Sequence, residues 1–478
     1  MDYMYNYRSF ILVFGFMCFV TCSSNKTIKS EQSPNFILIL SDDQGWNGTS
    51  VQMVDNMSLS KSDYHETPNL ELLAKKGMRF SSAYASAPVC SPSRYSIQFG
   101  QTPARLKMIR VGMNTDHINH QSSYTIPKLL KKINPNYKTA HFGKWGIGVD
   151  PSVLGFDESD GTTGNKDGGF DLKSNRKQWQ NNIDIDPKKI FTITSKAIDF
   201  IEQQSISNKP FFLQVSHYAV HSDIMMRQNT LDKYVKKSKG KYQNHPGFAA
   251  MTEDLDSGVG LLLNSLKALG LDKNTYVIYT SDNGAVPIMP PKSKYEKSSN
   301  FPLSRGKWDA MEGGIRVPFI MSGPKIRPGK ESKVPITHSD ILPTIIDLAG
   351  NKLPTAKNLD GGSFKQILLK GGNEKIRRNY EGLVFHVPYE NGIALKRAHS
   401  AIIIDNYKLI KFYDNNEFKL FDLTLDIQEK NNLINLNPLV FKRMKISLEN
   451  YLSDVMAPKW KSGITWKRTP IHEINSFH

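Results

Sequence analysis

Cysteine is scarce in this chain, with three residues among 478: Cys18, Cys22 and Cys90. Two of them lie near the N-terminus, in a segment that we expect to be cleaved or lipidated, so the mature protein keeps one thiol. One thiol excludes an internal disulfide and with it the small disulfide-stapled class of exported proteins. Long apolar runs are scarce too. No stretch reaches the roughly 18 apolar residues that a membrane-spanning helix requires.

The N-terminal segment has the pattern of an export signal. One arginine precedes the apolar run ILVFGFMCFV, and TCSSN follows it at once. We expect a signal peptide over residues 1–21, a polar tether over 22–34, and a protein exported to the periplasm or anchored in the outer membrane. FVTC before SSNK resembles a bacterial lipoprotein cleavage site, in which Cys22 carries the lipid. Phe19 and Thr21 are not the favoured residues there, so simple secretion stays open.

Acidic residues are few relative to basic ones, 45 against 62, which gives a formal net charge of +17. Such an excess indicates a polyanionic partner, which can be nucleic acid, an anionic membrane surface or an acidic polysaccharide. The composition is otherwise that of a soluble globular protein, with 39% hydrophobic and 22% charged residues.

Strands alternate with helices between residues 35 and 350. The apolar patterns predict strands at 34–41, 137–145, 209–221, 275–281 and 315–324, and helices at 67–80, 125–133, 189–204, 247–270 and 339–350. This alternation is typical of the α/β class, a mostly parallel sheet sandwiched by helices. We place a catalytic domain at 35–369.

Beyond about residue 370 the pattern changes to short strands with hairpin spacing. They are expected at 382–389, 398–405, 407–413 and 418–423, and an amphipathic helix follows at 438–456. These elements predict a smaller antiparallel α+β subdomain over 370–478.

Acidic side chains follow two of the predicted strands. Asp42 and Asp43 end one strand, and Asp282 and Asn283 end another. If these strands are parallel neighbours, their ends bring three carboxylates and an amide together, because open α/β sheets gather their ligands at that edge. Such hard oxygen ligands suit Ca²⁺ or Mg²⁺. Capping of loops and helices is the alternative for each residue alone.

Basic side chains occupy similar positions in the chain. They follow strands or sit in glycine-containing loops, and they are Arg94, Lys144, His221 and Lys307. A metal ion beside several cations makes a site for sulfate or phosphate. Each residue taken alone would instead be read as a solvated surface charge.

The segment APVCSPSR, residues 87–94, holds the remaining cysteine. Its prolines and its arginine argue against the buried edge of a helix. The segment matches the C-x-P-S-R signature of the type I sulfatases, the formylglycine-dependent branch of the alkaline phosphatase superfamily. Other stretches resemble that family in the same order: SDDQGW, GKWG, AVH, SDNG, GKWDAMEGGIRVP and HSDILPTIIDLAG. The resemblance spans about Asn35 to Leu433. Within the family, the chain resembles the polysaccharide sulfatases of marine Bacteroidetes.

The resemblance implies that Cys90 is oxidised to formylglycine by a formylglycine-generating or anaerobic sulfatase-maturing enzyme. One hydroxyl of the aldehyde hydrate then attacks sulfur, and the other later loses its proton to expel sulfate and restore the aldehyde. A serine alkoxide would instead remain as a stable sulfate ester. Pro92 and Arg94 look like part of the signal that the maturation enzyme reads.

The resemblance also implies one Ca²⁺ and a role for each basic residue. The implied metal ligands are Asp42, Asp43, Asp282, Asn283 and the modified Cys90. Arg94 would hold the hydrate, and Lys144 and Lys307 would bind sulfate oxygens. His221 would lie by the bridging oxygen, with Lys307 or His221 as general acid to the leaving alcohol.

One position departs from the family pattern. The family commonly shows GKWH, whose histidine helps to deprotonate the hydrate, whereas Gly146 stands there in this chain. His217 precedes His221 by four residues and would share its face if the segment were a strand throughout. We therefore consider His217 as the substitute, against a purely structural histidine.

Substrate identity is expected to depend on loops and on the C-terminal subdomain. Candidates for sugar contacts, each weighed against simple packing, are His217, Trp308, His386, Tyr389, Arg397 and His399. The net charge favours a sulfated polysaccharide, and the resemblance to enzymes of marine Bacteroidetes places algal ulvan or carrageenan first and glycosaminoglycans next. Alternatives are a phosphomonoester or phosphonate hydrolase of the same superfamily and a non-catalytic glycan-binding lipoprotein. We expect no nucleic-acid partner, and membrane contact only through the N-terminal lipid.

Overall fold

The computed structural model describes residues 1, 32–122, 124–170, 179–287, 299–351, 358–372, 374–390 and 395–467. The chain divides into two units, Met1–Gln32 and Ser33–His478. The expected signal peptide, most of the tether and the candidate lipid site Cys22 lie outside the described residues. Within the described part of the chain, no helix combines the length and the apolar character needed to cross a bilayer.

The second unit is built on an eight-stranded sheet. Strand β1 (Asn35–Ser41) lies between β7 (Phe211–Ser216) and β9 (Thr275–Ser281) and is parallel to both. Next to β7 come β4 (Lys138–Gly143) and β5 (Glu158–Ser159), also parallel. On the other side, β10 (Phe319–Ser322) runs antiparallel between β9 and β2 (Met78–Phe80), and β11 (Lys330–Ser332) forms the edge. The prediction of a mostly parallel sheet is confirmed.

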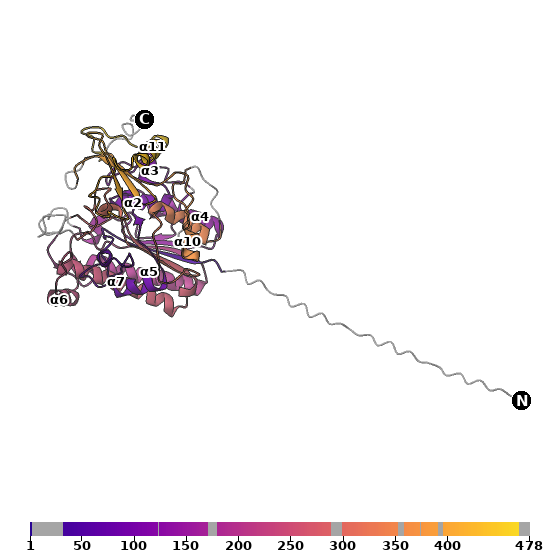
Figure 1. The fold of residues 1–478 in the computed structure, drawn as a ribbon. Helices are drawn as coiled ribbons and strands as arrows, with labels where there is room; N and C mark the ends of the chain where they lie inside the picture. The colour runs from indigo at the N-terminus through magenta and orange to yellow at the C-terminus, as the bar shows by residue number, and fades with distance from the viewer. Residues whose placement is uncertain are drawn as a thin grey trace. The chain divides into compact units, whose positions relative to one another are not determined.

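Both faces of this sheet are buried, as the apolar run in β1 predicts. Phe36 and Leu38 pack on one face, and Ile37 and Ile39 on the other. The Ile37 face is covered by α1 (Pro68–Lys76), α5 (Ile190–Ser207) and α7 (Pro246–Ala268). The opposite face is covered by α2 (Cys90–Phe99), α4 (Ile126–Ile133), α9 (Ile341–Leu348) and α10 (Lys365–Lys370). Figure 1 shows α5 and α7 on one side of the sheet and α2, α4 and α10 on the other.

Shorter elements connect these layers. They include helices α3 (Pro103–Leu106), α6 (Gln228–Lys236) and α8 (Glu312–Ile315), and the strand pairs β3 (Ala83–Tyr84) with β12 (Ile336–Thr337) and β6 (Asn182–Ile183) with β8 (Met225–Met226). Proline begins α1, α4 and α7 at their first two positions, where its missing N–H costs nothing.

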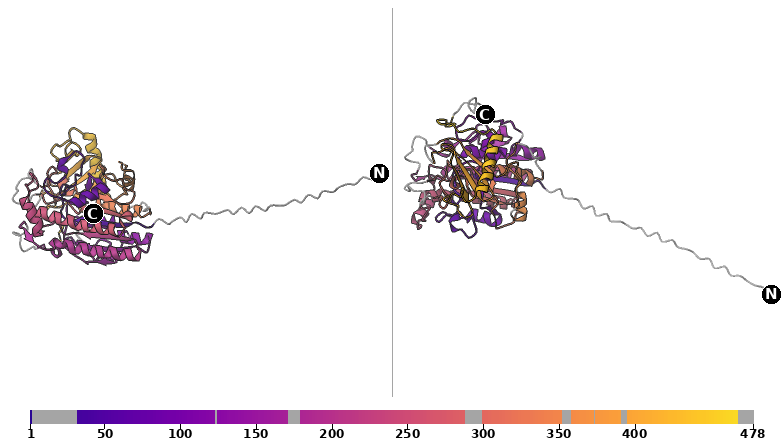
Figure 2. Two further views of the ribbon diagram at one scale, coloured as in Figure 1. Left: turned by 90° about the horizontal axis from the view of Figure 1, so that it is seen from below. Right: turned by 45° about the horizontal axis from the view of Figure 1, so that its top comes forward.

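The C-terminal part forms a second sheet of four antiparallel strands. These are β13 (Leu383–Val387), β14 (His399–Ile404), β15 (Tyr407–Phe412) and β16 (Phe418–Asp422). Helix α11 (Pro438–Asp454) lies against this sheet through Met444, Leu448 and Tyr451 (Figure 2). The predicted antiparallel α+β subdomain is thus present, whereas the domain boundary expected at residue 370 stays a prediction.

Two predicted elements end earlier than the sequence suggested. The helix expected over 67–80 ends at Lys76, because Gly77 lies against β10: a Cβ there would come 2.3 Å from the carbonyl oxygen of Met321. The strand expected over 209–221 ends at Ser216, and the chain then turns toward β1, where Val220 N donates to Asp42 O at 2.8 Å. The strand expected over 315–324 is present as β10 but runs antiparallel to its neighbours.

A buried ion-pair cluster joins the second sheet to the main domain. Lys408 on β15 is fully buried, and its Nζ lies 3.0 Å from Glu312 Oε1 and 2.8 Å from Glu429 Oε1. Glu312 also pairs with Arg316 at 2.7 Å. The cluster therefore ties β15 to the segment around α8.

Replacing Lys408 by methionine is expected to destabilise the protein by about 3–5 kcal/mol, because two buried carboxylates would face each other without their shared cation. Lys411→Met on the same strand is the matched control. It removes a partly exposed pair with Glu449, which is worth under about 1 kcal/mol. Urea unfolding curves measure both, and equal midpoints for the two variants would contradict the assignment.

Candidate active site

Three carboxylates meet at the carboxyl ends of β1 and β9. The parallel register sets Ser41 opposite Ser281, so the residues that follow each strand become neighbours. Asp43 N donates to Asp282 Oδ1 at 3.2 Å, and Asn283 Nδ2 donates to Asp43 Oδ1 at 2.7 Å. Asp43 adopts a left-handed backbone, with φ at 58°. The two acidic strand ends therefore lie side by side, as the sequence led us to expect.

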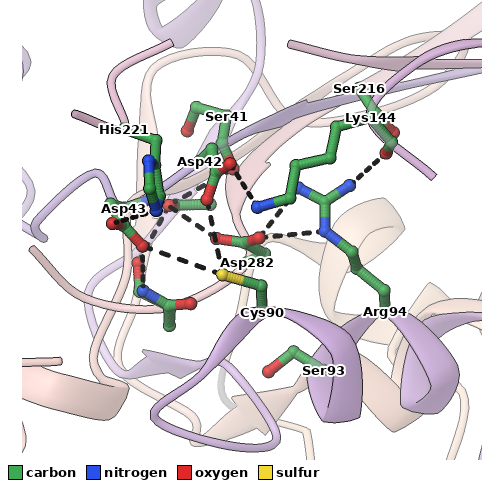
Figure 3. Close-up of polar contacts among 12 residues, drawn as sticks. Ser41, Asp42, Asp43, Cys90, Ser93, Arg94, Lys144, Ser216, His221 and Asp282 are labelled. Carbon is green, nitrogen blue, oxygen red and sulfur yellow. Dashed lines mark hydrogen bonds and ion pairs between the residues drawn. The ribbon is translucent and has the colours of Figure 1, made fainter. Parts of the chain in front are cut away.

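Cys90 lies against these carboxylates at the first residue of α2. Its Sγ is 3.5 Å from Asp42 Oδ1 and 3.9 Å from Asp43 Oδ1 (Figure 3). The segment before it is folded back by Ser93, whose Oγ bonds both the N–H and the carbonyl of Ala87 at 3.0 Å. The expectation that APVCSPSR avoids a buried helix edge is wrong. The segment begins a buried helix, and the charge of Arg94 is neutralised inside the protein.

Each carboxylate has a cationic partner from a different element. Arg94, one turn after Cys90, donates from Nε and Nη2 to Asp282 Oδ2 at 3.0 and 2.8 Å, and from Nη1 to the carbonyl of Lys144. The Nζ of Lys144, just past β4, lies 2.5 Å from Asp42 Oδ2. Lys307 Nζ lies 2.7 Å from Asp43 Oδ2. Three negative groups thus face three positive ones, and all six are buried.

These pairs set the protonation states of the cluster. Burial alone would raise the pKa of Asp42, but Lys144 and His221 hold it below its usual value. Burial acts on Asp43 in the same way, and Lys307 lowers its pKa below the usual value. Burial raises the pKa of the Cys90 thiol, so the unmodified thiol stays protonated. Both aspartates are therefore ionised at neutral pH.

His221 completes the group on the side of Asp43. Its Nε2 lies 3.6 Å from Asp43 Oδ2, and its Nδ1 bonds the carbonyl of Ser222 at 2.5 Å. The ring also meets Phe170 edge-on, with centroids 5.0 Å apart. Burial and the charge of Lys307 lower the pKa of His221 to about 4, so the imidazole is neutral at pH 7.

The oxygen atoms of this cluster fit a hard divalent cation. One atom each from Asp42, Asp43, Cys90 and Asp282 lies within 4.8 Å of the others. Asn283 adds an amide oxygen, Oδ1, which is buried and has no hydrogen-bond partner. A buried acceptor left without a donor is costly, and a cation would satisfy it. These residues are those that the sequence proposed as metal ligands.

The other predicted contact residues are placed as follows. Trp308 adjoins Lys307, whose Nζ lies 5.5 Å from the indole centroid. His217 is buried, and its Nδ1 has no hydrogen-bond partner among the described residues. Since β7 ends at Ser216, the strand that would align His217 with His221 does not extend that far. The role suggested for His217 stays a prediction.

Two C-terminal histidines are held by protein atoms. His386 bonds Ser400 Oγ at 2.6 Å and the carbonyl of Pro458 at 2.7 Å. His399 accepts from Ala310 N at 2.9 Å and bonds the carbonyl of Arg397 at 2.8 Å. Both nitrogens of each ring are thus used within the protein, and both rings are buried. These contacts give the two histidines a structural role.

Gly146, where the family pattern has histidine, lies against Arg94. Its φ is +71°, and a Cβ there would come 2.9 Å from Arg94 Cδ. The stem of Arg94 thus occupies the space that a side chain would need, unless that stem shifts. Sequence reasoning also missed His338, which is buried close enough to Asp282 and Arg94 for their charges to act on its ring. Its only sequence signal is the HSD that precedes α9.

Models of two families match the chain. A model described as sulfatase matches residues 34–351, and one described as N-sulphoglucosamine sulphohydrolase, C-terminal, matches residues 307–457. The first match includes every residue of the cluster around Cys90.

Curated relatives and a solved structure agree with these matches. The chain is 31% identical to N-acetylgalactosamine-6-sulfatase of Mus musculus over 381 residues, 71% of this chain and 67% of that protein. It is 26% identical to an ulvan-active sulfatase of Formosa agariphila over 462 residues, 89% of this chain and 83% of that protein. The crystal structure of Ps i-CgsB superposes with a TM-score of 0.72 at 25% identity, over 93% of this chain and 97% of that one. The chain therefore belongs to the sulfatase family and is a hydrolase of sulfuric esters.

Proposed function

We propose that this protein removes sulfate from a sulfated polysaccharide or its oligosaccharides, with formylglycine formed from Cys90 as the nucleophile precursor. The observation that carries the proposal is the position of Cys90. It begins α2 in the sequence CSPSR, with Sγ 3.5 and 3.9 Å from two buried aspartates. Lys144 and Lys307 pair with those same aspartates.

The residues around position 90 have separable tasks in this proposal. Arg94 is fixed by Asp282 and by the Lys144 carbonyl, so its guanidinium holds the hydrate in one orientation. The ammonium groups of Lys144 and Lys307 bind sulfate oxygens. Lys307, which is protonated at neutral pH, is the first candidate to protonate the oxygen of the leaving sugar, whereas His221 would first have to gain a proton because its imidazole is neutral at pH 7. A bound Ca²⁺ would polarise the sulfate and favour the ionised nucleophile.

The substrate class follows from charge and from similarity. A formal net charge of +17 favours a polyanion over a small neutral aryl group as the carrier of the sulfate. One relative is named an ulvan-active sulfatase and another an N-acetylgalactosamine-6-sulfatase. Both names indicate a sulfated carbohydrate. We place algal glycans, ulvan or carrageenan, first and glycosaminoglycans second, in a protein exported to the periplasm or the outer membrane.

A phosphomonoester or phosphonate hydrolase is the second candidate. A phosphonate monoester hydrolase of Agrobacterium radiobacter shares the fold, with a TM-score of 0.63. The pair Lys144 and Lys307 with His221 favours sulfate. A non-catalytic glycan-binding protein is not supported, because the nucleophile position and its charged partners are all in place.

Cys90→Ala is expected to lower sulfate release by at least about 10³-fold, since it removes the nucleophile precursor. In the wild type, mass analysis of the peptide around residue 90 should show the decrease in mass that accompanies conversion of the CH2SH side chain to an aldehyde. The control is wild-type protein produced without the maturation enzyme, which should carry a thiol and no activity. Full activity of that control would contradict the mechanism.

Calcium is expected to bind and to raise the melting temperature of the wild-type protein. Asn283→Ala should weaken this stabilisation, because it removes the one ligand oxygen without a protein partner. Asn119→Ala, at an exposed position, is the matched control. Calorimetric titration with Ca²⁺ and Mg²⁺ measures the affinity directly. Equal calcium responses in wild type and Asn283→Ala would contradict the ligand assignment.

A panel of substrates decides between the two candidate reactions. The wild type is expected to release sulfate from sulfated algal oligosaccharides and to turn over an aryl sulfate faster than the matching aryl phosphate. Inorganic sulfate and phosphate are measured in parallel, and the position that has lost sulfate is read from the product. Faster turnover of the phosphate would favour the phosphohydrolase.

A further inference from the structure

Lys188 is a buried lysine whose ammonium group has no salt-bridge or hydrogen-bond partner in the part of the chain that the structure describes. It lies in the 3-10 turn Pro187–Lys189, directly before α5, and is 2% exposed. Within the described ranges, no carboxylate pairs with its Nζ and no acceptor bonds it. The other buried lysines of the site differ, since Lys144 and Lys307 each have an aspartate. Burying an unpaired charge is costly, and it lowers the pKa of Lys188 to about 8.

The backbone holds Lys188 in place by an uncommon conformation. Lys188 and Lys189 are both left-handed, with φ at 53° and 54°. L-residues adopt this region reluctantly, and two in succession are rarer still. The result is that Lys188 is buried, whereas Lys189 is exposed. Such strain persists where the surrounding structure enforces it, often at functional sites.

The turn adjoins the catalytic cluster on the side of His221. It packs against β8, the strand that follows the His221–Asp223 loop. The charges of Asp223, Asp42 and Asp43 all act on the Lys188 ammonium. Lys188 thus lies close enough to the aspartates beside Cys90 for their charges to act on its ammonium group, without belonging to the cluster around Cys90.

Two further polar side chains near His221 each have an oxygen atom without a hydrogen-bond partner among the described residues. Asp223 is 6% exposed, and its Oδ1 is buried without a hydrogen bond. Asn165 places Nδ2 3.5 Å from His221 Nε2, while its Oδ1 is buried without a donor. A cation and two acceptors therefore lie close to the His221–Asp223 loop, and each lacks the partner that a buried polar group normally has. One ligand with an anionic group and hydroxyl groups would satisfy all three.

We propose that Lys188, Asp223 and Asn165 bind the sugar that carries the scissile sulfate, with Lys188 pairing with a second oxyanion of the substrate. That oxyanion is a carboxylate or a second sulfate ester, and Asp223 and Asn165 accept hydroxyl hydrogens. The inference rests on the proposed function, and it adds that the preferred substrate carries two anionic groups close together. Lys188 is then a specificity residue, because the scissile sulfate itself is bound by Lys144 and Lys307.

The test compares substrates that differ in one oxyanion. kcat and KM are measured on a monosulfated oligosaccharide, on its disulfated form and on a form that bears a carboxylate instead. Lys188→Met should lower the ratio of kcat/KM between doubly and singly charged substrates by about tenfold, mainly through KM, because one charge-assisted contact is lost. The doubly charged substrate, disulfated or carboxylated, for which this ratio falls more identifies the oxyanion that Lys188 binds.

Lys189→Met is the matched control, with the same backbone conformation and an exposed side chain, and its ratio should equal that of the wild type. Lys188→Arg should retain most of the preference, and Lys188→Gln provides a second neutral variant. Lys188→Met is expected to keep or raise the melting temperature, since it removes an unpaired buried charge.

An unchanged ratio in Lys188→Met and Lys188→Gln would overturn the inference and leave the proposed function standing. A lower melting temperature with an equal loss on every substrate would also overturn it, by assigning Lys188 a structural role. A wild-type enzyme that carries formylglycine and releases sulfate from no sugar would overturn the proposed function itself, and the inference with it.

Discussion

The parallel pairing of β1 with β9 imposes the electrostatic problem that the rest of the site resolves. With Ser41 opposite Ser281, three buried carboxylates lie side by side with little water to screen them. Their mutual repulsion is tolerable only if cations of matching geometry are buried beside them. The fold supplies one cation to each carboxylate, from α2, from the end of β4 and from the loop that holds Lys307. The same six charges that make the cluster stable also make it suited to an anionic ester.

The positions of these cations depend on parts of the fold that carry no chemistry. Trp308 N donates to Pro88 O at 2.8 Å, which fixes the loop of Lys307 against the segment before Cys90. The downstream end of that loop is held by Glu312, which Lys408 of the second sheet neutralises. The C-terminal subdomain therefore stabilises the site from a distance. None of the charged groups paired around Cys90 in the described structure belongs to that subdomain, yet the loop of Lys307 is fixed against it.

Sequence reasoning reached the parts of this site that local patterns encode. Apolar strands ending in Asp42–Asp43 and Asp282–Asn283 predicted a shared edge, and the register of β1 and β9 places them there. It failed where burial is decided by distant partners. The segment from Cys90 to Arg94 reads as too polar for a buried helix, because nothing in it shows that Asp282 will pair with the arginine. For the same reason His386 and His399 could be named only as candidates for sugar contacts, weighed against packing, since their partners lie far along the chain or on another strand.

In this protein, the groups proposed for catalysis differ from those proposed for sugar recognition in their ion pairs and hydrogen bonds more than in their charge. In the proposed function, groups that act on sulfur must be oriented before the substrate arrives, and the charged groups around Cys90 are bonded to one another in the free protein. Groups that recognise a particular sugar must have unused bonding capacity, and the role proposed for Lys188 and Asp223 depends on such capacity, which the buried Oδ1 of Asp223 has among the described residues. Lys188 combines burial with the lack of a partner among the described residues, and that combination is visible only in three dimensions. The exposed positive charges attract a polyanion at long range and are screened by salt, with a Debye length of about 8 Å at physiological ionic strength. Lys188 is shielded from that screening by burial, so selectivity between substrates can persist where the general attraction has faded.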